Sequence, residues 1–173
     1  IAVAGSIGKT GTKRAIATVL SEGKKVQWED GNYNDIVSVP LIFFGQKMPP
    51  LLNPVAWLIV FIKNELMLRG EYPYDVVVVE VGSDYYGNLD EFTVRLKVDY
   101  GVLTGISAEH MMNFADLDAV AEEESKIAQM SEQLLVNADQ VDQKYLKQLP
   151  KTALTYGEGP YDCVITPAKI SKE

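Results

Sequence analysis

The sequence predicts an α/β fold, in which a mostly parallel β-sheet is covered by helices on both faces. Short runs of β-branched residues alternate along the chain with segments of helical apolar spacing, which is the order typical of strand–helix–strand units. One run, residues 76–79, consists of four valines. Such a run is apolar on both faces, as expected of a central parallel strand. A glycine-rich turn lies between the first strand and the first helix, at the end of the sheet where such folds bind ligands.

The expected elements are short and bounded by glycine, proline or polar residues. The expected strands are residues 1–4, 26–28, 76–81, 100–106, 134–137, 153–156 and 163–166. The expected helices are residues 9–21, 54–69, 116–130 and 139–149. Gly23 ends the first helix, Pro54 lies in the first turn of the second, and Asp116 is placed to cap the third. We expect residues 1–173 to form one domain.

Composition excludes several classes of protein. A net charge of −8 argues against nucleic acid as a partner, because phosphate contacts require a basic face. The only cysteine, Cys163, is expected to be a small buried hydrophobe, and one cysteine with one histidine, His110, makes a zinc site improbable. Residues 55–62 are the most apolar run and are too short for a membrane span. The chain opens on a strand that should be buried and shows no signal peptide, so we expect a cytoplasmic protein with an N-terminal part before residue 1.

The strongest local signal is a candidate phosphate-binding loop. It reads Gly5-Ser6-Ile7-Gly8-Lys9-Thr10 and lies between a strand and a helix, which is the context that such a loop needs. Glycines let backbone N–H groups turn toward an anion, and the helix N-terminus adds a favourable dipole. Lys9 can reach the β- and γ-phosphates, and the Thr10 hydroxyl can bind Mg²⁺. The commonest form of this loop has its first glycine at the position of Val3, so the loop is a variant of the P-loop NTPase type.

Three downstream positions are further candidates for the site. Glu80 ends the valine run, where a carboxylate could bind Mg²⁺ or could simply be solvated at a strand exit. His110 follows another expected strand and is either a second metal or phosphate contact or a loop histidine without a role. Residues 122–124 are three glutamates on an expected helix. They form an exposed acidic face or, because successive residues lie about 100° apart, direct at most one or two carboxylates to a metal.

Taken together, these motifs resemble the central domain of the Mur ligase family over nearly the whole chain. The segments that carry the resemblance are the loop at 5–13, Asn32-Tyr33-Asn34-Asp35 with Val39-Pro40, Val79-Glu80-Val81-Gly82 with Gly87-Asn88-Leu89, residues 104–110 with Phe114, and Asn137-Ala138-Asp139. The resemblance is strongest to the branch that adds D-alanyl-D-alanine to a UDP-N-acetylmuramoyl tripeptide. The family also contains enzymes that add other amino acids to wall precursors, and folylpolyglutamate synthases.

The resemblance implies an ATP-dependent amide ligase of peptidoglycan precursor synthesis. ATP phosphorylates a substrate carboxylate, and an amino acid or dipeptide attacks the acyl phosphate. The substrates implied are ATP, with Mg²⁺, a UDP-muramoyl peptide and the amine. Nucleotide contacts are then expected from Gly5, Ser6, Ile7, Gly8, Lys9, Thr10, Gly11 and Asn137. Metal contacts are expected from Thr10, Glu80, His110 and Glu124, with Lys9, Glu80, His110 and Glu124 as the catalytic set.

Three positions depart from the family pattern: Ser38 stands where the family usually has glycine, Ile7 where a polar residue is common, and Glu124 on the helix after the histidine. Many members carry a carbamylated lysine on the helix after the histidine, and the matching position is Glu124, which can supply a carboxylate directly. The resemblance also implies that the UDP-binding and C-terminal domains lie outside this chain, that the fragment alone is inactive, and that the full-length enzyme is a monomer. Two alternatives remain: a ligase that elongates folate polyglutamate, and a non-catalytic nucleotide-binding module. A generic P-loop kinase fits less well because of the early glycine.

Overall fold

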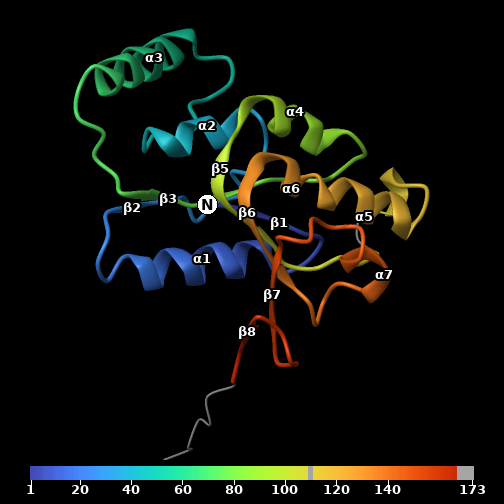
Figure 1. Ribbon diagram of the computed structural model, residues 1–173. Coiled ribbons are helices and arrows are strands. Elements are labelled where there is room, and N and C mark those ends of the chain that lie inside the picture. The colour runs from blue at the N-terminus through green and yellow to red at the C-terminus, as the bar shows by residue number, and fades with distance from the viewer. Residues whose placement is uncertain (109–110, 167–173) are drawn as a thin grey trace, which may run out of the picture.

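The protein is described here from a computed structural model that covers residues 1–108 and 111–166. Its main sheet has six strands in the order β4-β1-β5-β6-β7-β8, and every neighbouring pair is parallel (Figure 1). The strands are β1 (Ala2–Ala4), β4 (Val79–Glu80), β5 (Val98–Leu103), β6 (Ser131–Asn137), β7 (Leu154–Gly157) and β8 (Cys163–Val164). A second parallel pair joins β2 (Val26–Gln27) to β3 (Val76–Val77). The α/β class with a parallel sheet is thus confirmed.

The valine run at 76–79 is not a single central strand. Its first half pairs with β2 and its second half with β1, because the Val78 N–H donates to Gln27 O at 2.9 Å while the Val79 N–H donates to Ile1 O at 2.9 Å. β4 therefore lies at the edge of the six-stranded sheet, whose middle is formed by β5 and β6. The run is apolar on both faces because Val78 and Val79 are both buried, on opposite sides of the sheet.

Helices cover both faces of the sheet. α1 (Lys9–Leu20) lies on one face, where Ala17 packs on Val3, and α2, α4, α5 and α6 lie on the other, where the larger core includes Ala2 and Ala4 (Figure 1). The alternation of Ala2, Val3 and Ala4 between the two cores follows from the two-residue period of a strand. The remaining helices are α2 (Ser38–Phe43), α3 (Pro54–Leu68), α4 (Asn88–Arg95), η1 (Met111–Asn113), α5 (Leu117–Ser125), α6 (Ile127–Met130) and α7 (Gln143–Leu146).

The first two expected helices are confirmed as α1 and α3, and the other two differ in extent. The helix expected at 116–130 is interrupted at Lys126, whose N–H donates to Glu123 O and tightens the turn between α5 and α6. The helix expected at 139–149 is reduced to α7, because Asp142 accepts from the Lys144 N–H and caps a later start. α2 and α4 were not predicted, since each is too short for a clear helical period.

Candidate functional site

The glycine-rich loop follows β1 and begins α1. Gly5 has φ +129°, and a Cβ added there would lie 2.2 Å from Thr104 Oγ1, so only glycine fits this early position. Gly8 has φ +81° and is the N-cap of α1, and no side chain caps the helix. The first N–H groups of α1 are therefore left to bind an anion, helped by the helix dipole.

Polar side chains from the start of α1 contact Glu80 at the end of β4. The Thr10 hydroxyl donates to Glu80 Oε2 at 3.0 Å, and Lys13 Nζ lies 3.2 Å from the same oxygen. Lys13 is fully buried and also donates to Gly31 O at 3.3 Å. Lys9 Nζ reaches back over the loop and donates to Gly5 O at 2.6 Å. Residues that are 70 positions apart thus place a hydroxyl and a carboxylate side by side, a pair of the oxygen ligands that Mg²⁺ prefers.

A polar hollow of about 460 Å³ opens at this point. It is lined by Ser6, Ile7, Gly8, Lys9, Thr10, Gly11, Asn32, Asn34, Glu80 and Asp84. Asn32, Asn34 and Asp84 were not among the predicted site residues. The two asparagines belong to the segment that carried the family resemblance, and the Gly82 N–H donates to Asn34 O at 2.7 Å, which ties that segment to the end of β4. Asp84 follows in the same turn, and nothing in its local sequence sets it apart.

Glu124 lies beneath the loop and not in the lining of the hollow. Its Oε1 accepts from Ser83 Oγ at 2.7 Å and lies 3.5 Å from Ser6 Oγ, while its Oε2 is buried without a hydrogen-bond partner. The side chain is only 2 % exposed. Burial raises the pKa of this carboxyl to about 7, against the hydrogen bond from Ser83 and the charge of Lys9, which both lower it. A buried carboxylate oxygen without a partner, next to the loop, fits a cation held at this place.

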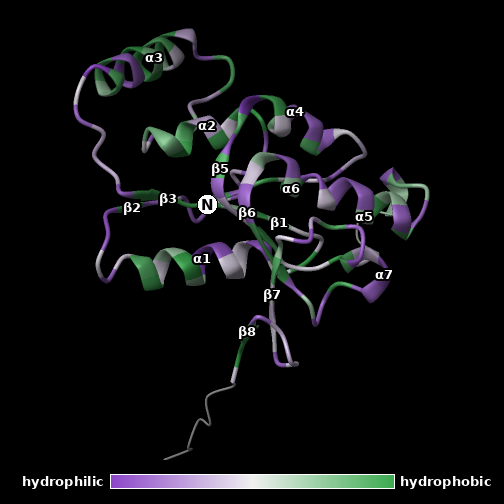
Figure 2. Ribbon diagram, in the orientation of Figure 1, coloured by the Kyte–Doolittle hydropathy of each residue, from purple (hydrophilic) through white to green (hydrophobic). Residues whose placement is uncertain are grey.

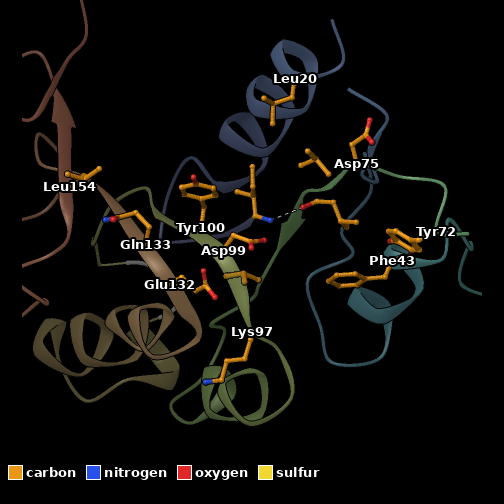
Figure 3. Close-up of a pocket in the computed structure, with 14 residues that line it drawn as sticks. Leu20, Phe43, Tyr72, Asp75, Lys97, Asp99, Tyr100, Glu132, Gln133 and Leu154 are labelled. Atoms are coloured by element: carbon orange, nitrogen blue, oxygen red, sulfur yellow. Dashed lines mark hydrogen bonds between the residues drawn. The ribbon is translucent and has the colours of Figure 1, made fainter. Parts of the chain in front are cut away.

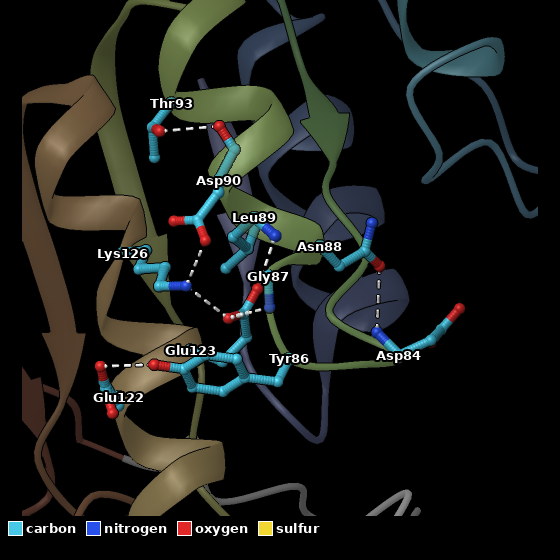
Figure 4. A network of polar contacts seen from close by, with 10 residues as sticks. All are labelled: Asp84, Tyr86, Gly87, Asn88, Leu89, Asp90, Thr93, Glu122, Glu123 and Lys126. Carbon is cyan, nitrogen blue, oxygen red and sulfur yellow. Dashed lines mark hydrogen bonds and ion pairs between the residues drawn. The ribbon is translucent and has the colours of Figure 1, made fainter. Parts of the chain in front are cut away.

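The three consecutive glutamates differ in their surroundings, and Figure 4 shows the first two, Glu122 and Glu123, with different partners. Glu122 is exposed and accepts from Tyr86 Oη at 2.8 Å. Glu123 is fully buried, accepts from the Gly87 and Leu89 N–H groups at the start of α4, and pairs with Lys126. The interpretation of this run as an exposed acidic face is therefore wrong for Glu123 and Glu124, which are both buried. The three carboxylates do not gather at one site, as expected from the rotation of about 100° per helical residue. Glu123 stabilises the N-terminus of α4, and Lys126 pairs with both Glu123 and Asp90.

Among the predicted site residues that the structure describes, Asn137, like Glu124, does not line the hollow. His110 lies outside the described residues. Asn137 ends β6, and its side chain accepts from the Asp139 N–H at 3.2 Å and does not line the hollow. Within residues 1–108 and 111–166, no three His, Cys, Asp or Glu side chains gather into a metal site. Mg²⁺ does not require such a cage, because it usually keeps waters and substrate phosphates as ligands.

A larger cavity, of about 1020 Å³, lies at the opposite ends of the strands (Figure 3). Its lining includes Asp75, Asp99 and Glu132, and the backbone nitrogen of Ile1 at its edge donates to Val77 O at 2.8 Å. Parallel α/β sheets bind their ligands at the carboxyl ends of the strands, so the smaller hollow at the loop is the candidate site.

The fold and the site together define a parallel α/β domain with a glycine-rich loop between its first strand and first helix. The chain belongs to the Mur ligase family: the model of the Mur ligase middle domain matches residues 62–172. The family resemblance inferred from the sequence is thus confirmed.

Comparison with individual proteins gives the same result. The chain is 33% identical over 127 residues to the UDP-N-acetylmuramoyl-tripeptide–D-alanyl-D-alanine ligase of Borreliella burgdorferi, which covers 73% of this chain and 22% of that enzyme. It is 26% identical over 128 residues to the Escherichia coli enzyme, covering 73% of this chain and 23% of that enzyme. The chain therefore spans about a fifth of the length of these relatives.

Solved structures show the same fold. MurF of Acinetobacter baumannii superposes with a TM-score of 0.66 at 20% identity, over 91% of this chain and 31% of that one. MurF ligase of Thermotoga maritima, solved in complex with ADP, superposes with a TM-score of 0.64 at 20% identity, over 96% of this chain and 34% of that one.

Proposed function

We propose that this chain is the nucleotide-binding domain of an ATP-dependent amide ligase. The observation that carries the proposal is the contact between Thr10 and Glu80 at the mouth of the phosphate loop. In this proposal Lys9 leaves Gly5 O and, with the N–H groups of the loop, holds the nucleotide phosphates. Gly5 to Gly11 shape the cradle. The chemistry asked of these residues is positioning and charge neutralisation, the main requirements of phosphoryl transfer.

Magnesium is part of the proposal, and the residues present fit it. Thr10 and Glu80 would hold one ion, and Glu124 with His110 would contribute to a second. The orphan oxygen of Glu124 supports this second role, and the family resemblance matches Glu124 to the position of the carbamylated lysine. When bound, Mg²⁺ supplies neutralising charge to the phosphates. Asn137 stays a proposed nucleotide contact on the strength of the family resemblance alone.

The reaction that we propose begins with phosphorylation of a substrate carboxylate by ATP. An amine then attacks the acyl phosphate and yields an amide, ADP and phosphate. The relatives' names support a UDP-N-acetylmuramoyl peptide as the acid and an amino acid or dipeptide as the amine. Because this chain covers about a fifth of those relatives, we propose that it acts with further domains in a monomeric cytoplasmic enzyme and has no ligase activity alone.

The test is ATP turnover by the full gene product that carries this sequence. ADP should form only when both a UDP-muramoyl tripeptide and D-alanyl-D-alanine are present, and mass spectrometry should find the amide. Lys9→Ala should abolish turnover, and Arg14→Ala, which changes an exposed residue of the same helix, should not. ADP formation with a folate and glutamate instead would assign the folate-elongating class. Nucleotide binding without turnover on either substrate pair would indicate a non-catalytic module.

A further inference from the structure

Helix α3 is an apolar helix without a covering partner in the part of the chain described. Val60 is its only buried residue, and the ribbon shows the helix standing away from the body of the fold, with hydrophobic stretches along it (Figure 2). The exposed apolar side chains of the helix and of the turn before it are Leu51, Leu52, Val55, Leu58, Ile59, Phe61, Ile62, Leu66 and Leu68. We call this set the α3 surface. Leu52 is 97% exposed, and continuous patches of this kind mark interaction sites.

The α3 surface is too broad for a helix-to-helix seam. At about 100° per residue, its exposed positions spread over about 180° of the helix circumference, from Ile59 on one side to Leu68 on the other. A paired helix in a coiled coil presents a narrower stripe. The surface wraps around a single projecting helix, and its relief includes a hollow of about 600 Å³ lined by Leu52, Leu58 and Phe61. A fluid apolar layer can cover such a shape without a matching groove.

The charges around the α3 surface differ in sign from the rest of the molecule. Residues 48–62 contain no charged side chain and are flanked by Lys47 and Lys63. Residues 44–70 hold three basic residues and one acidic residue, whereas the whole chain has a net charge of −8. The acidic residue, Glu65, is paired with Arg69 at 2.9 Å. This surface therefore combines apolar area with a basic border, the combination that attracts anionic lipid headgroups.

We propose that the α3 surface docks on the surface of an anionic lipid bilayer. α3 would lie in the interface, with Leu52, Leu58 and Ile62 among the acyl chains and Lys47 and Lys63 at the headgroups. Trp57, whose ring lies 6.0 Å from that of Phe61, is of the residue type that prefers this interface. The helix does not cross the bilayer: among the described residues, no helix has the length and apolarity for a span. This docking is independent of the phosphate loop.

The test is flotation of residues 1–173 with vesicles of phosphatidylcholine alone or mixed with phosphatidylglycerol. The chain should float with the anionic vesicles, and Leu58→Glu should weaken that binding at least about tenfold. The matched control is Val94→Glu, an equally drastic change at an 81% exposed position on α4, which should leave binding unchanged. Lys9→Ala should also leave it unchanged. Circular dichroism of each variant checks that the fold is retained.

Fluorescence gives a second readout at the proposed contact. The chain has two tryptophans, so a Trp28→Phe background leaves Trp57 as the only reporter. Anionic vesicles should shift its emission to shorter wavelengths, and brominated acyl chains should quench it. No flotation with either vesicle would overturn the proposal. A dimer in sedimentation that Leu58→Glu dissociates, without vesicle binding, would equally overturn it and would show that a second copy covers the surface.

Discussion

Replacing Glu124 with glutamine should make the protein more stable at neutral and alkaline pH. The buried carboxyl is held between Ser83 and Ser6, with one oxygen unpartnered. Burial raises its pKa in the folded state to about 7 from an ordinary value of 4.5. A carboxyl with a raised folded pKa binds its proton more tightly in the folded than in the unfolded chain. Folding is therefore least favourable where both states are ionised.

The magnitude follows from the two pKa values. Below pH 4.5 the carboxyl is neutral in both states and has no linked effect on stability. Between pH 4.5 and about 7 the destabilisation grows, and above about 7 it is complete. One pKa unit corresponds to about 1.4 kcal/mol, so the full effect is about 3 kcal/mol. Glutamine keeps the shape and has no charge to bury, so this pH-dependent destabilisation should disappear in Glu124→Gln.

The assay is urea unfolding of the parent and Glu124→Gln between pH 4 and 8, without nucleotide or metal. The difference in free energy of unfolding should be small at the acid end and should rise to about 3 kcal/mol in favour of the variant at the alkaline end. Glu122→Gln, on the exposed side of the same helix, should change stability by less than about 0.5 kcal/mol throughout. A variant that is less stable than the parent at pH 8, or a difference that does not change with pH, would refute the reasoning.

Three further predictions concern stability. Gly5→Ala should destabilise the fold by about 2 kcal/mol or more, because its Cβ would collide with Thr104 at a positive φ. Gly11→Ala, in the first turn of α1, meets nothing within 4 Å and should stabilise the fold by up to about 1 kcal/mol. Thermal unfolding of both variants is the test, and equal effects on stability would contradict the geometry. Asp116→Ala removes the cap that accepts from the Ala119 N–H and should cost about 1 kcal/mol in urea unfolding, so an unchanged midpoint would count against that cap. Lys13→Met leaves the Glu80 carboxylate buried without its cationic partner and should lower the free energy of unfolding by about 3 to 5 kcal/mol in urea. Adding Glu80→Gln to Lys13→Met should recover part of this loss. A smaller loss in the single variant, with no recovery in the double variant, would contradict the pairing.

The sequence was informative where local chemistry decides the structure. The turn from Gly5 to Thr10 has a fixed backbone requirement, so both the loop and the start of α1 could be predicted. The position of Glu80 at the carboxyl end of its strand was also predictable, since the valine run before it is long and apolar. Its contact with Thr10 follows from the parallel pairing of β1 with β4, and that choice of neighbouring strand was not predicted from the sequence.

The sequence was less informative where burial depends on distant packing. The burial of Glu123 arises because α4 begins directly opposite it, and α4 itself is too short to be predicted. Cys163, expected to be buried, is exposed because β8 is the last strand of the sheet. Met111 and Met112 are likewise exposed, on the turn η1. The helix at α3 was predicted, but only the structure shows that no part of residues 1–108 and 111–166 covers its apolar side chains.

The central claim is that the loop from Gly5 to Thr10 binds nucleotide phosphates. Calorimetric titration of residues 1–173 with ATP, in the presence and absence of Mg²⁺, tests it most directly. The account predicts Mg²⁺-dependent binding that weakens at least about tenfold in Lys9→Ala and is retained in Arg14→Ala. Binding by Lys9→Ala that equals that of the parent, or no binding of ATP by the parent with or without Mg²⁺, would contradict the claim.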